Sequence, residues 1–252
     1  MVINNITVTG LLIEDGKVCG VMAGDERMEA GLVILADGAN SLLAQQAGLG
    51  TPPEPGTTCV GVKEVIQLGE ETVNSRFGLA GDEGVEYMYL GDRSAGNYAD
   101  GFIYTNRDSV SVGIEFLIGD IDKTDKAVPE LLEEFKELPA VAELIEGGTL
   151  LEYSAHIVHH GGSSKLGRLC GDGVLIAGDA AGLVANYGFT IRGMDLAVES
   201  GILAAETAIA LRESGDYSAE ALSAYQQAVE SSGIFRELRR CEEYMNETHG
   251  GV

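Results

Sequence analysis

Two consecutive runs decide the fold of this chain: Gly173-Val-Leu-Ile-Ala-Gly-Asp-Ala-Ala-Gly182 and Leu183-Val-Ala-Asn-Tyr-Gly-Phe-Thr-Ile-Arg-Gly-Met-Asp-Leu-Ala197. The first apolar residues predict a buried strand, the glycines predict tight turns, and the later small and apolar residues predict a long helix. This order places the carboxylate of Asp179 at the carboxyl end of a strand and close to a helix N-terminus. Ligands of α/β proteins bind at such strand ends.

The residues after this strand suit a flat ligand that carries sugar hydroxyls. The carboxylate of Asp179 can accept hydrogen bonds from those hydroxyls, although capping of the next helix is the preferred explanation of an isolated Gly-Asp. A flat ligand can lie against the backbone because the neighbouring residues are small: Gly178, Ala180, Ala181 and Gly182. Gly193 offers N–H groups and the positive end of the helix dipole.

A second short apolar run, Leu32–Ala36, ends in the same manner with Asp37-Gly38. Alone, this Asp-Gly pair indicates only a turn. Two such strand ends can nevertheless flank one crevice of a sheet, which is where α/β proteins bind their ligands. Asp37 and Gly38 therefore join the candidate ligand site.

Three side chains near the second run are further candidates. Arg192 can contact a ligand phosphate or an electron-rich ring, or it can instead form a surface ion pair with Asp195. Tyr187 and Phe189 lie beside glycines and are candidates for the wall of a substrate pocket, although ordinary packing explains them equally well. No residue is assigned a catalytic role from the sequence.

The histidines and cysteines do not predict a metal site. His156, His159 and His160 form a cluster in sequence, but on a strand His159 points away from the other two. The four cysteines are far apart and form no C-x-x-C pair, so zinc and iron–sulfur sites have little support.

The charge of the chain limits its partners. Its 252 residues carry 16 basic and 40 acidic side chains, a net charge of −24. This excess disfavours nucleic acid and fits either a solvated surface or docking to a basic protein. The sequence shows no signal peptide and no apolar run that predicts a membrane-spanning helix. We expect a cytoplasmic protein, with peripheral contact at the inner face of the membrane left open.

The chain divides into two parts by pattern. Residues 56–159 are rich in short predicted strands and favour an antiparallel sheet, whereas residues 1–55 and 160–252 contain the strand, glycine turn and helix pattern. The expected fold class is α/β with α+β elements. It comprises a partial Rossmann-like domain for FAD or NAD(P), discontinuous in sequence, with an inserted antiparallel-sheet domain for substrate or acceptor.

Several motifs together resemble one family. The Asp-Gly motif in residues 36–41 and the Gly-Asp motif in residues 177–182 resemble those of FAD-dependent oxidoreductases related to geranylgeranyl reductases and aromatic hydroxylases. The chain is similar more narrowly, over nearly its whole length, to FixC-type electron-transfer flavoprotein–quinone oxidoreductases. The motifs that carry this resemblance are Gly61-Val-Lys-Glu64, Phe102-Ile-Tyr-Thr-Asn106, Val174-Leu-Ile-Ala177 and Gly188-Phe-Thr-Ile-Arg-Gly-Met-Asp-Leu-Ala197.

The resemblance implies an FAD cofactor, an electron-transfer flavoprotein as electron donor and a quinone as acceptor. It implies that Asp179 contacts the ribityl and pyrophosphate region, and that the backbone near Gly193 and Met194 approaches the pyrimidine side of the ring. The expected cofactor site comprises Asp37, Gly38, Gly178, Asp179, Ala180, Gly182, Arg192, Gly193 and Met194.

The chain departs from the family pattern at both ends. The family begins with a strand and a G-x-G-x-x-G turn that hold the AMP half of FAD, and this sequence begins after that unit and stops before a further C-terminal segment. We therefore expect weak or absent flavin binding by this chain alone. Two other functions remain open: a non-catalytic remnant or one half of a split flavoenzyme, and a reductase of isoprenoid or other lipid double bonds.

Overall fold

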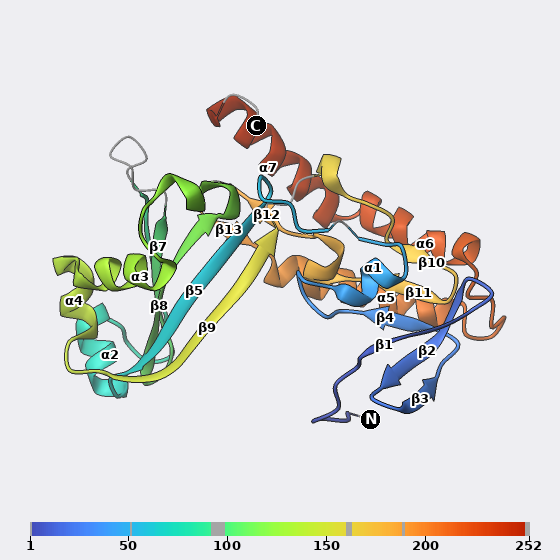
Figure 1. Cartoon of the computed structure of the whole chain (residues 1–252), viewed down its shortest axis with the longest axis horizontal. Helices are drawn as coiled ribbons and strands as arrows, with labels where there is room; N and C mark the ends of the chain where they lie inside the picture. The colour runs from blue at the N-terminus through green and yellow to red at the C-terminus, as the bar shows by residue number, and fades with distance from the viewer. Residues whose placement is uncertain (1, 51, 92–98, 160–162, 188–189, 250–252) are drawn as a thin grey trace. The chain divides into compact units, whose positions relative to one another are not determined.

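A computed structural model describes residues 2–50, 52–91, 99–159, 163–187 and 190–249. The chain separates into two compact units, of which the first comprises Met1–Pro53 and His159–Val252 and the second comprises Glu54–Val158. Helices accompany both parallel and antiparallel strands (Figure 1), which confirms the expected mixed fold class.

The first unit is built on a small sheet with the strand order β10-β11-β4. Its strands are β10 (Cys170–Gly171), β11 (Val174–Ile176) and β4 (Val33–Leu35). β11 runs parallel to β4, with Ile176 opposite Leu35, and the three residues of β11 are almost fully buried. Burial on both faces explains why β11 is a continuous apolar run, whereas Ile34 in the middle of β4 is exposed.

Three helices follow β11 in the first unit: α5 (Met194–Ala210), α6 (Ala219–Ser231) and α7 (Gly233–His249). The sequence predicts that Ser218 caps one helix that runs to about Met245. The cap is confirmed, because the Ser218 hydroxyl accepts a hydrogen bond from the Ala221 N–H at 3.3 Å. The single helix is wrong. The helix stops where Ser232 adopts extended backbone, and the Ser232 hydroxyl then accepts from the Ile234 N–H at 3.0 Å.

The remaining elements of the first unit are short. An antiparallel meander comprises β1 (Gly10–Glu14), β2 (Lys17–Ala23) and β3 (Glu26–Glu29). The β-forming residues Asn5–Ile13 predict a strand over that range, but the strand begins only at Gly10. The four residues of β3 are all exposed and give no apolar pattern that would predict it. The other elements are α1 (Leu42–Gln46), the 3-10 turns η3 (Ser163–Lys165) and η4 (Gly178–Ala181), and the hairpin of β12 (Ala185–Asn186) and β13 (Ile191–Arg192).

The second unit contains a five-stranded sheet in the order β6-β7-β8-β5-β9. The strands are β5 (Thr58–Gln67), β6 (Glu86–Tyr89), β7 (Asp100–Thr105), β8 (Ser109–Leu117) and β9 (Thr149–His159). The pairs β5–β8, β7–β8 and β6–β7 are antiparallel, as the sequence predicts. The last residue of β9, His159, belongs to the first unit.

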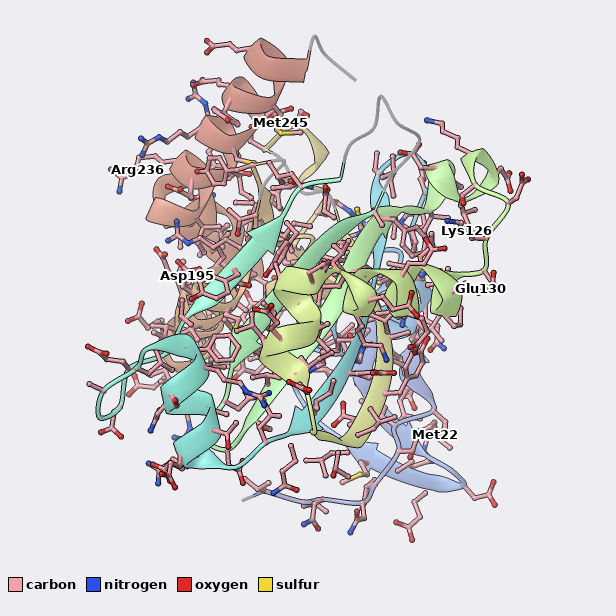
Figure 2. All side chains as sticks on the ribbon, turned by 90° about the vertical axis from the view of Figure 1, so that its left-hand side faces the viewer. Met22, Lys126, Glu130, Asp195, Arg236 and Met245 are labelled. Atoms are coloured by element: carbon pink, nitrogen blue, oxygen red, sulfur yellow. The ribbon has the colours of Figure 1, made fainter. Side chains whose placement is uncertain are left out.

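The helices of the second unit are α2 (Glu70–Phe77), the 3-10 helix η2 (Ile118–Lys123), α3 (Val128–Glu137) and α4 (Pro139–Ile145). The sequence predicts α3 and α4 but not α2, whose first turn is acidic and which interrupts the predicted run of strands. At the start of α3, the Glu130 carboxylate accepts a hydrogen bond from the Ala127 N–H at 2.8 Å, and Lys126 projects nearby (Figure 2). Leu132 and Phe135 of α3 are buried in the core of this unit.

Among the residues that the structure describes, no helix combines the length and the apolar character needed to cross a bilayer.

Candidate functional site

The two strand-end motifs lie next to each other in the structure. The Ala177 N–H donates to the Leu35 carbonyl at 2.9 Å. The parallel strands β4 and β11 therefore end side by side, with their carboxyl ends together. Asp37-Gly38 follows one strand and Gly178-Asp179 follows the other. Both glycines have positive φ, +80° at Gly38 and +63° at Gly178, which turns each chain sharply at little steric cost. The structure thus brings together candidates that are far apart in sequence.

The carboxylate of Asp179 lies against the start of α5. A Cβ added to Gly193 would lie 3.3 Å from Asp179 Oδ1 and 3.5 Å from a Val184 methyl group. Burial raises the pKa of Asp179, and the nearby His159 acts in the opposite direction. A partly buried carboxylate beside a bare helix N-terminus is therefore the centre of the candidate site.

His159 is a site residue that the sequence did not indicate. Its Nε2 lies 2.8 Å from the carbonyl oxygen of Ala39, and because a carbonyl only accepts, Nε2–H is the donor. The side chain is 9% exposed. His159 thus joins the loop after Asp37 to the neighbourhood of Asp179. No sequence pattern connects it with Ala39, which is 120 positions away.

The turn after β11 is held by α5 and α6. The Gly178 N–H donates to the Ser200 hydroxyl at 3.0 Å, and that hydroxyl donates to the Ala197 carbonyl at 2.9 Å. The Tyr225 hydroxyl donates to the Ile176 carbonyl at 3.0 Å. A Cβ at Gly178 would approach the Ala197 side chain to 3.2 Å. Small residues on α5 therefore allow the strand end to approach the helix closely.

The remaining glycines leave open space beside the carboxylates. A Cβ at Gly38 or at Gly182 would meet no atom of the described residues within 4 Å. Asp37 is exposed, and its carboxylate accepts a hydrogen bond from the Ser41 hydroxyl at 2.8 Å. Ala180 is buried, so it can offer a ligand only its backbone, whereas Met194 is 88% exposed.

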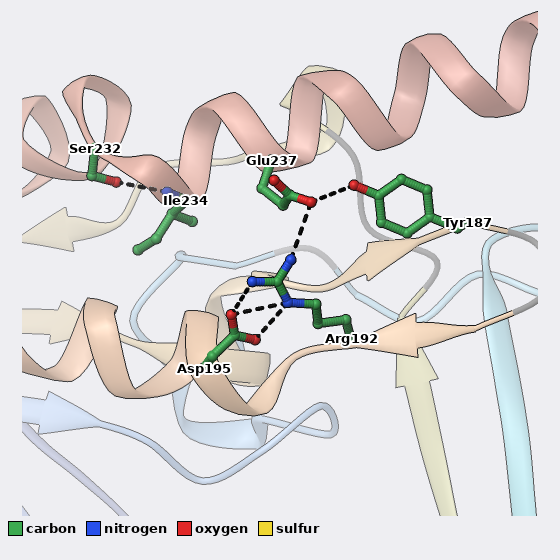
Figure 3. A network of polar contacts seen from close by, with 6 residues as sticks. All are labelled: Tyr187, Arg192, Asp195, Ser232, Ile234 and Glu237. Carbon is green, nitrogen blue, oxygen red and sulfur yellow. Dashed lines mark hydrogen bonds and ion pairs between the residues drawn. The ribbon is translucent and has the colours of Figure 1, made fainter. Parts of the chain in front are cut away.

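Arg192 forms ion pairs with two carboxylates (Figure 3). Its Nε lies 2.9 Å from Asp195 Oδ2, and its Nη1 lies 3.1 Å from Glu237 Oε1 on α7. The hydrogen bond from Arg192 lowers the pKa of Asp195. The ion pair with Asp195 was the alternative that the sequence left open. A role of Arg192 at a ligand stays a prediction.

Tyr187 also belongs to this network. Its hydroxyl donates to Glu237 (Figure 3), and its ring centroid lies 5.9 Å from that of Tyr244 on α7. Burial, followed by the hydrogen bond to Glu237, raises the pKa of Tyr187 to about 12. These contacts fit the packing alternative, and its place in a pocket stays a prediction. Phe189, the other pocket candidate, lies outside the described residues, as does His160.

Within the described residues, no three His, Cys, Asp or Glu side chains gather in the way that a metal site requires. The arrangement instead combines two carboxylates at adjacent parallel strand ends with the N-terminus of a long helix. This arrangement is typical of the Rossmann-like fold class.

Comparison with solved structures supports this class. The chain superposes on a geranylgeranyl bacteriochlorophyll reductase-like protein from Thermoplasma acidophilum with a TM-score of 0.70 and 21% identity, covering 95% of this chain and 56% of that one. A mutant of the halogenase PltM, in complex with FAD, gives a TM-score of 0.59 and 16% identity, covering 88% and 45%. At these identities the likeness concerns the fold.

No family model matches the chain. Comparison with curated proteins finds relatives of higher sequence identity. The chain is 47% identical over 237 residues to the probable electron transfer flavoprotein-quinone oxidoreductase YdiS of Escherichia coli K12. It is 46% identical over 237 residues to FixC of the same organism, and 38% identical over 244 residues to FixC of Bradyrhizobium diazoefficiens. The predicted resemblance to FixC-type proteins is therefore confirmed.

These matches cover most of this chain but only part of the relatives. The alignments include 94% of the chain and 55% of both Escherichia coli proteins, and 95% and 56% for the Bradyrhizobium protein. The chain thus spans about half the length of the curated relatives that it matches.

Proposed function

We propose that this chain provides part of the FAD site of an oxidoreductase that moves electrons from an electron-transfer flavoprotein towards a quinone. The observation that carries the proposal is the juxtaposition of Asp37-Gly38 and Gly178-Asp179 at one edge of the parallel β4–β11 pair, beside the start of α5. The names of the relatives supply the direction of electron transfer.

The residues present fit the ribityl and ring side of FAD. Open space at Gly38 and Gly182 leaves room for a ligand beside both carboxylates. The absence of a side chain at Gly193 leaves the N-terminus of α5 without a side-chain cap. A flavin with hydroxyl donors and a polarisable ring matches carboxylate acceptors and a positive helix end.

Each candidate residue has a distinct part in this proposal. Asp179 would accept hydrogen bonds from the ribityl hydroxyls, while the backbone of Gly178, Ala180 and Gly182 would lie along the cofactor. The N–H groups at Gly193 and Met194 would face the pyrimidine side of the ring, where the positive end of α5 stabilises negative charge. FAD itself would supply the electron-accepting chemistry.

Arg192 would act at the rim of this site. Its guanidinium is about half exposed and already balances Asp195 and Glu237. It would therefore keep the start of α5 and α7 in place and offer its remaining N–H groups to a cofactor phosphate. Asp37 would form the opposite wall, oriented by Ser41.

Two different functions compete with this proposal. A reductase of lipid double bonds has the support of the fold shared with a geranylgeranyl reductase-like protein, but the higher identity with FixC-type proteins favours electron transfer. A non-catalytic remnant or one half of a split flavoenzyme is the second alternative. Flavin binding and quinone reduction separate these functions.

The test is anaerobic quinone reduction by the purified protein with added FAD and a reduced electron-transfer flavoprotein. The proposal predicts reduction of a soluble quinone analogue that requires both the donor flavoprotein and a large excess of FAD, because we expect this chain alone to bind flavin weakly. Reduction of a prenyl substrate without any quinone activity would favour the lipid reductase. Flavin binding without turnover of either substrate would favour the split or non-catalytic form.

A further inference from the structure

His159 is a buried side chain that reaches the candidate ligand site from the end of β9. Its Nε2–H donates to the Ala39 carbonyl at 2.8 Å, and the residue is 9% exposed. Both residues belong to the first unit. Burial of an imidazole costs free energy unless its N–H is hydrogen-bonded, and this bond satisfies that N–H. The bond is therefore a fixed contact of the folded unit.

The turn that His159 contacts follows β4 and comprises residues 37–41. Two other carbonyls of the turn are bound from nearby in the chain. That of Gly38 accepts from the Ser41 N–H at 3.1 Å, and that of Asn40 accepts from the Gln45 side chain at 3.3 Å. The Ala39 carbonyl, in contrast, is bound by a side chain 120 positions away. Of these three bonds, the one from the imidazole is the one that local sequence cannot supply.

The bond from the imidazole orients a whole peptide group. The peptide between Ala39 and Asn40 is trans, so its carbonyl oxygen and the Asn40 N–H point in opposite directions. Because the carbonyl is directed at His159, the Asn40 N–H is directed away from it. A donor on the carbonyl also polarises the peptide group and strengthens its N–H as a donor. A Cβ at Gly38 would meet no described atom within 4 Å, which leaves room for a ligand beside this turn.

A backbone donor in this turn complements the carboxylates of the site. When ionised, Asp37 and Asp179 only accept hydrogen bonds, so they can bind the ribityl hydroxyls of FAD but not its phosphate or carbonyl oxygens. Those oxygens need N–H donors, which backbone groups in turns commonly supply to anions. The Asn40 N–H is a donor of this kind.

We propose that His159 is a positioning residue of the flavin site, which holds the Ala39–Asn40 peptide so that the Asn40 N–H donates to an acceptor oxygen of FAD. The inference rests on the proposed function for the identity of the ligand. The orientation of the turn by His159 does not depend on that function. Without the imidazole N–H, this peptide group is free to rotate, and the site loses a donor while its carboxylates stay unchanged.

Two substitutions separate hydrogen bonding from packing. His159→Phe keeps an aromatic ring of similar size but has no N–H, whereas His159→Gln loses the ring but keeps an N–H donor of similar reach. We expect His159→Phe to weaken FAD binding about 5- to 10-fold, as loss of one hydrogen bond typically does, and His159→Gln to stay within about twofold of the wild type. Fluorescence titration with FAD measures both effects. A packing role predicts the opposite order.

Amide hydrogen exchange of the protein without FAD gives a second measurement. In His159→Phe, residues 38–41 should exchange about tenfold faster than in the wild type, because the turn loses its long-range bond, and His159→Gln should restore the protection. His156→Phe is the matched control, since His156 is an exposed histidine of the same strand. It should change neither FAD binding nor exchange.

Thermal melts of each variant identify any loss of folding. Equal exchange of residues 38–41 in folded His159→Phe and in the wild type would overturn the inference, as would tighter FAD binding by His159→Phe than by His159→Gln. Nitrogen NMR of the wild-type imidazole should show a proton on Nε2, and a proton on Nδ1 alone would overturn the inference even if no variant folds. If the wild type binds no FAD, the proposed function fails, and exchange and NMR alone decide whether His159 positions the turn.

Discussion

Asp179 is the residue on which the cofactor site depends most. Its carboxylate is partly buried, its pKa is raised by that burial, and it lies against the bare start of α5. Burial makes the Asp179 carboxylate costly to ionise, and hydrogen-bond donors of a ligand bound at this strand end would offset that cost. The sequence placed Asp179 there from the apolar run and the glycines around it, and His159 was found only from the structure.

Asp179→Asn should reduce FAD affinity about 10- to 100-fold, because hydrogen bonds to a charged group contribute about 1.5–3 kcal/mol. The free energy of unfolding without FAD should stay constant or rise, since the raised pKa shows that the folded state disfavours the charge. Fluorescence titration with FAD and urea unfolding measure the two effects. Asp25→Asn, at an exposed position of the meander, is the control and should change neither.

Glu115 on β8 makes the stability of the second unit depend on pH. Burial is the main cause that raises its pKa from 4.5 to about 7, with Asp100 adding to the rise and a hydrogen bond with Cys59 opposing it. The folded state thus holds a proton that the unfolded state releases above pH 4.5. The stabilisation is complete below pH 4.5 and is lost as the pH rises to about 7.

Glu115→Gln should therefore flatten this pH dependence and stabilise the protein at pH 8 by up to about 3 kcal/mol. Urea unfolding between pH 5 and pH 8 measures the slope. Glu86→Gln, at an exposed position of the same sheet, should keep the wild-type slope. An unchanged slope in Glu115→Gln would show that another group causes the pH dependence.

At the level of elements, apolar runs and a capping residue were sufficient to predict individual strands and a helix start. The apolar runs predicted β4 and β11, and Ser218 predicted the start of α6. The break between α6 and α7 was missed although Ser231-Ser232-Gly233 is a cluster of turn residues, because the helical pattern resumes directly after it. Local pattern allowed β4 and β11 to be neighbours but could not establish it, because strand pairing across such a distance depends on the whole unit.

Gly178→Ala should destabilise the first unit by about 2–3 kcal/mol, because it combines a positive φ with a Cβ contact of 3.2 Å to Ala197. Gly215→Ala is the matched control. Gly215 has a similar φ of +65°, but a Cβ there meets no described atom within 4 Å, so only about 1 kcal/mol is expected. If both variants lost the same free energy of unfolding in urea, the close approach of Gly178 to α5 would not contribute to stability.

At the scale of the whole molecule, the chain shares its fold with solved flavoenzyme structures and its sequence with FixC-type proteins. The candidate ligand site of the first unit lies at the carboxyl ends of parallel strands, as in Rossmann-like folds. Sequence identities of 38–47% connect the chain with FixC-type proteins. The chain spans about half of their length, so its activity and partners stay proposals. Its acidic charge is compatible with docking to a basic protein surface.

The most direct test of the central claim is amide hydrogen exchange of the protein with and without saturating FAD. Our account predicts that FAD protects residues 37–41, 178–183 and 193–196, the two strand ends and the start of α5, and that Asp179→Asn reduces this protection at the same FAD concentration. Protection confined to other segments, or no protection in any segment at saturating FAD, would contradict the assignment of this edge as the flavin site.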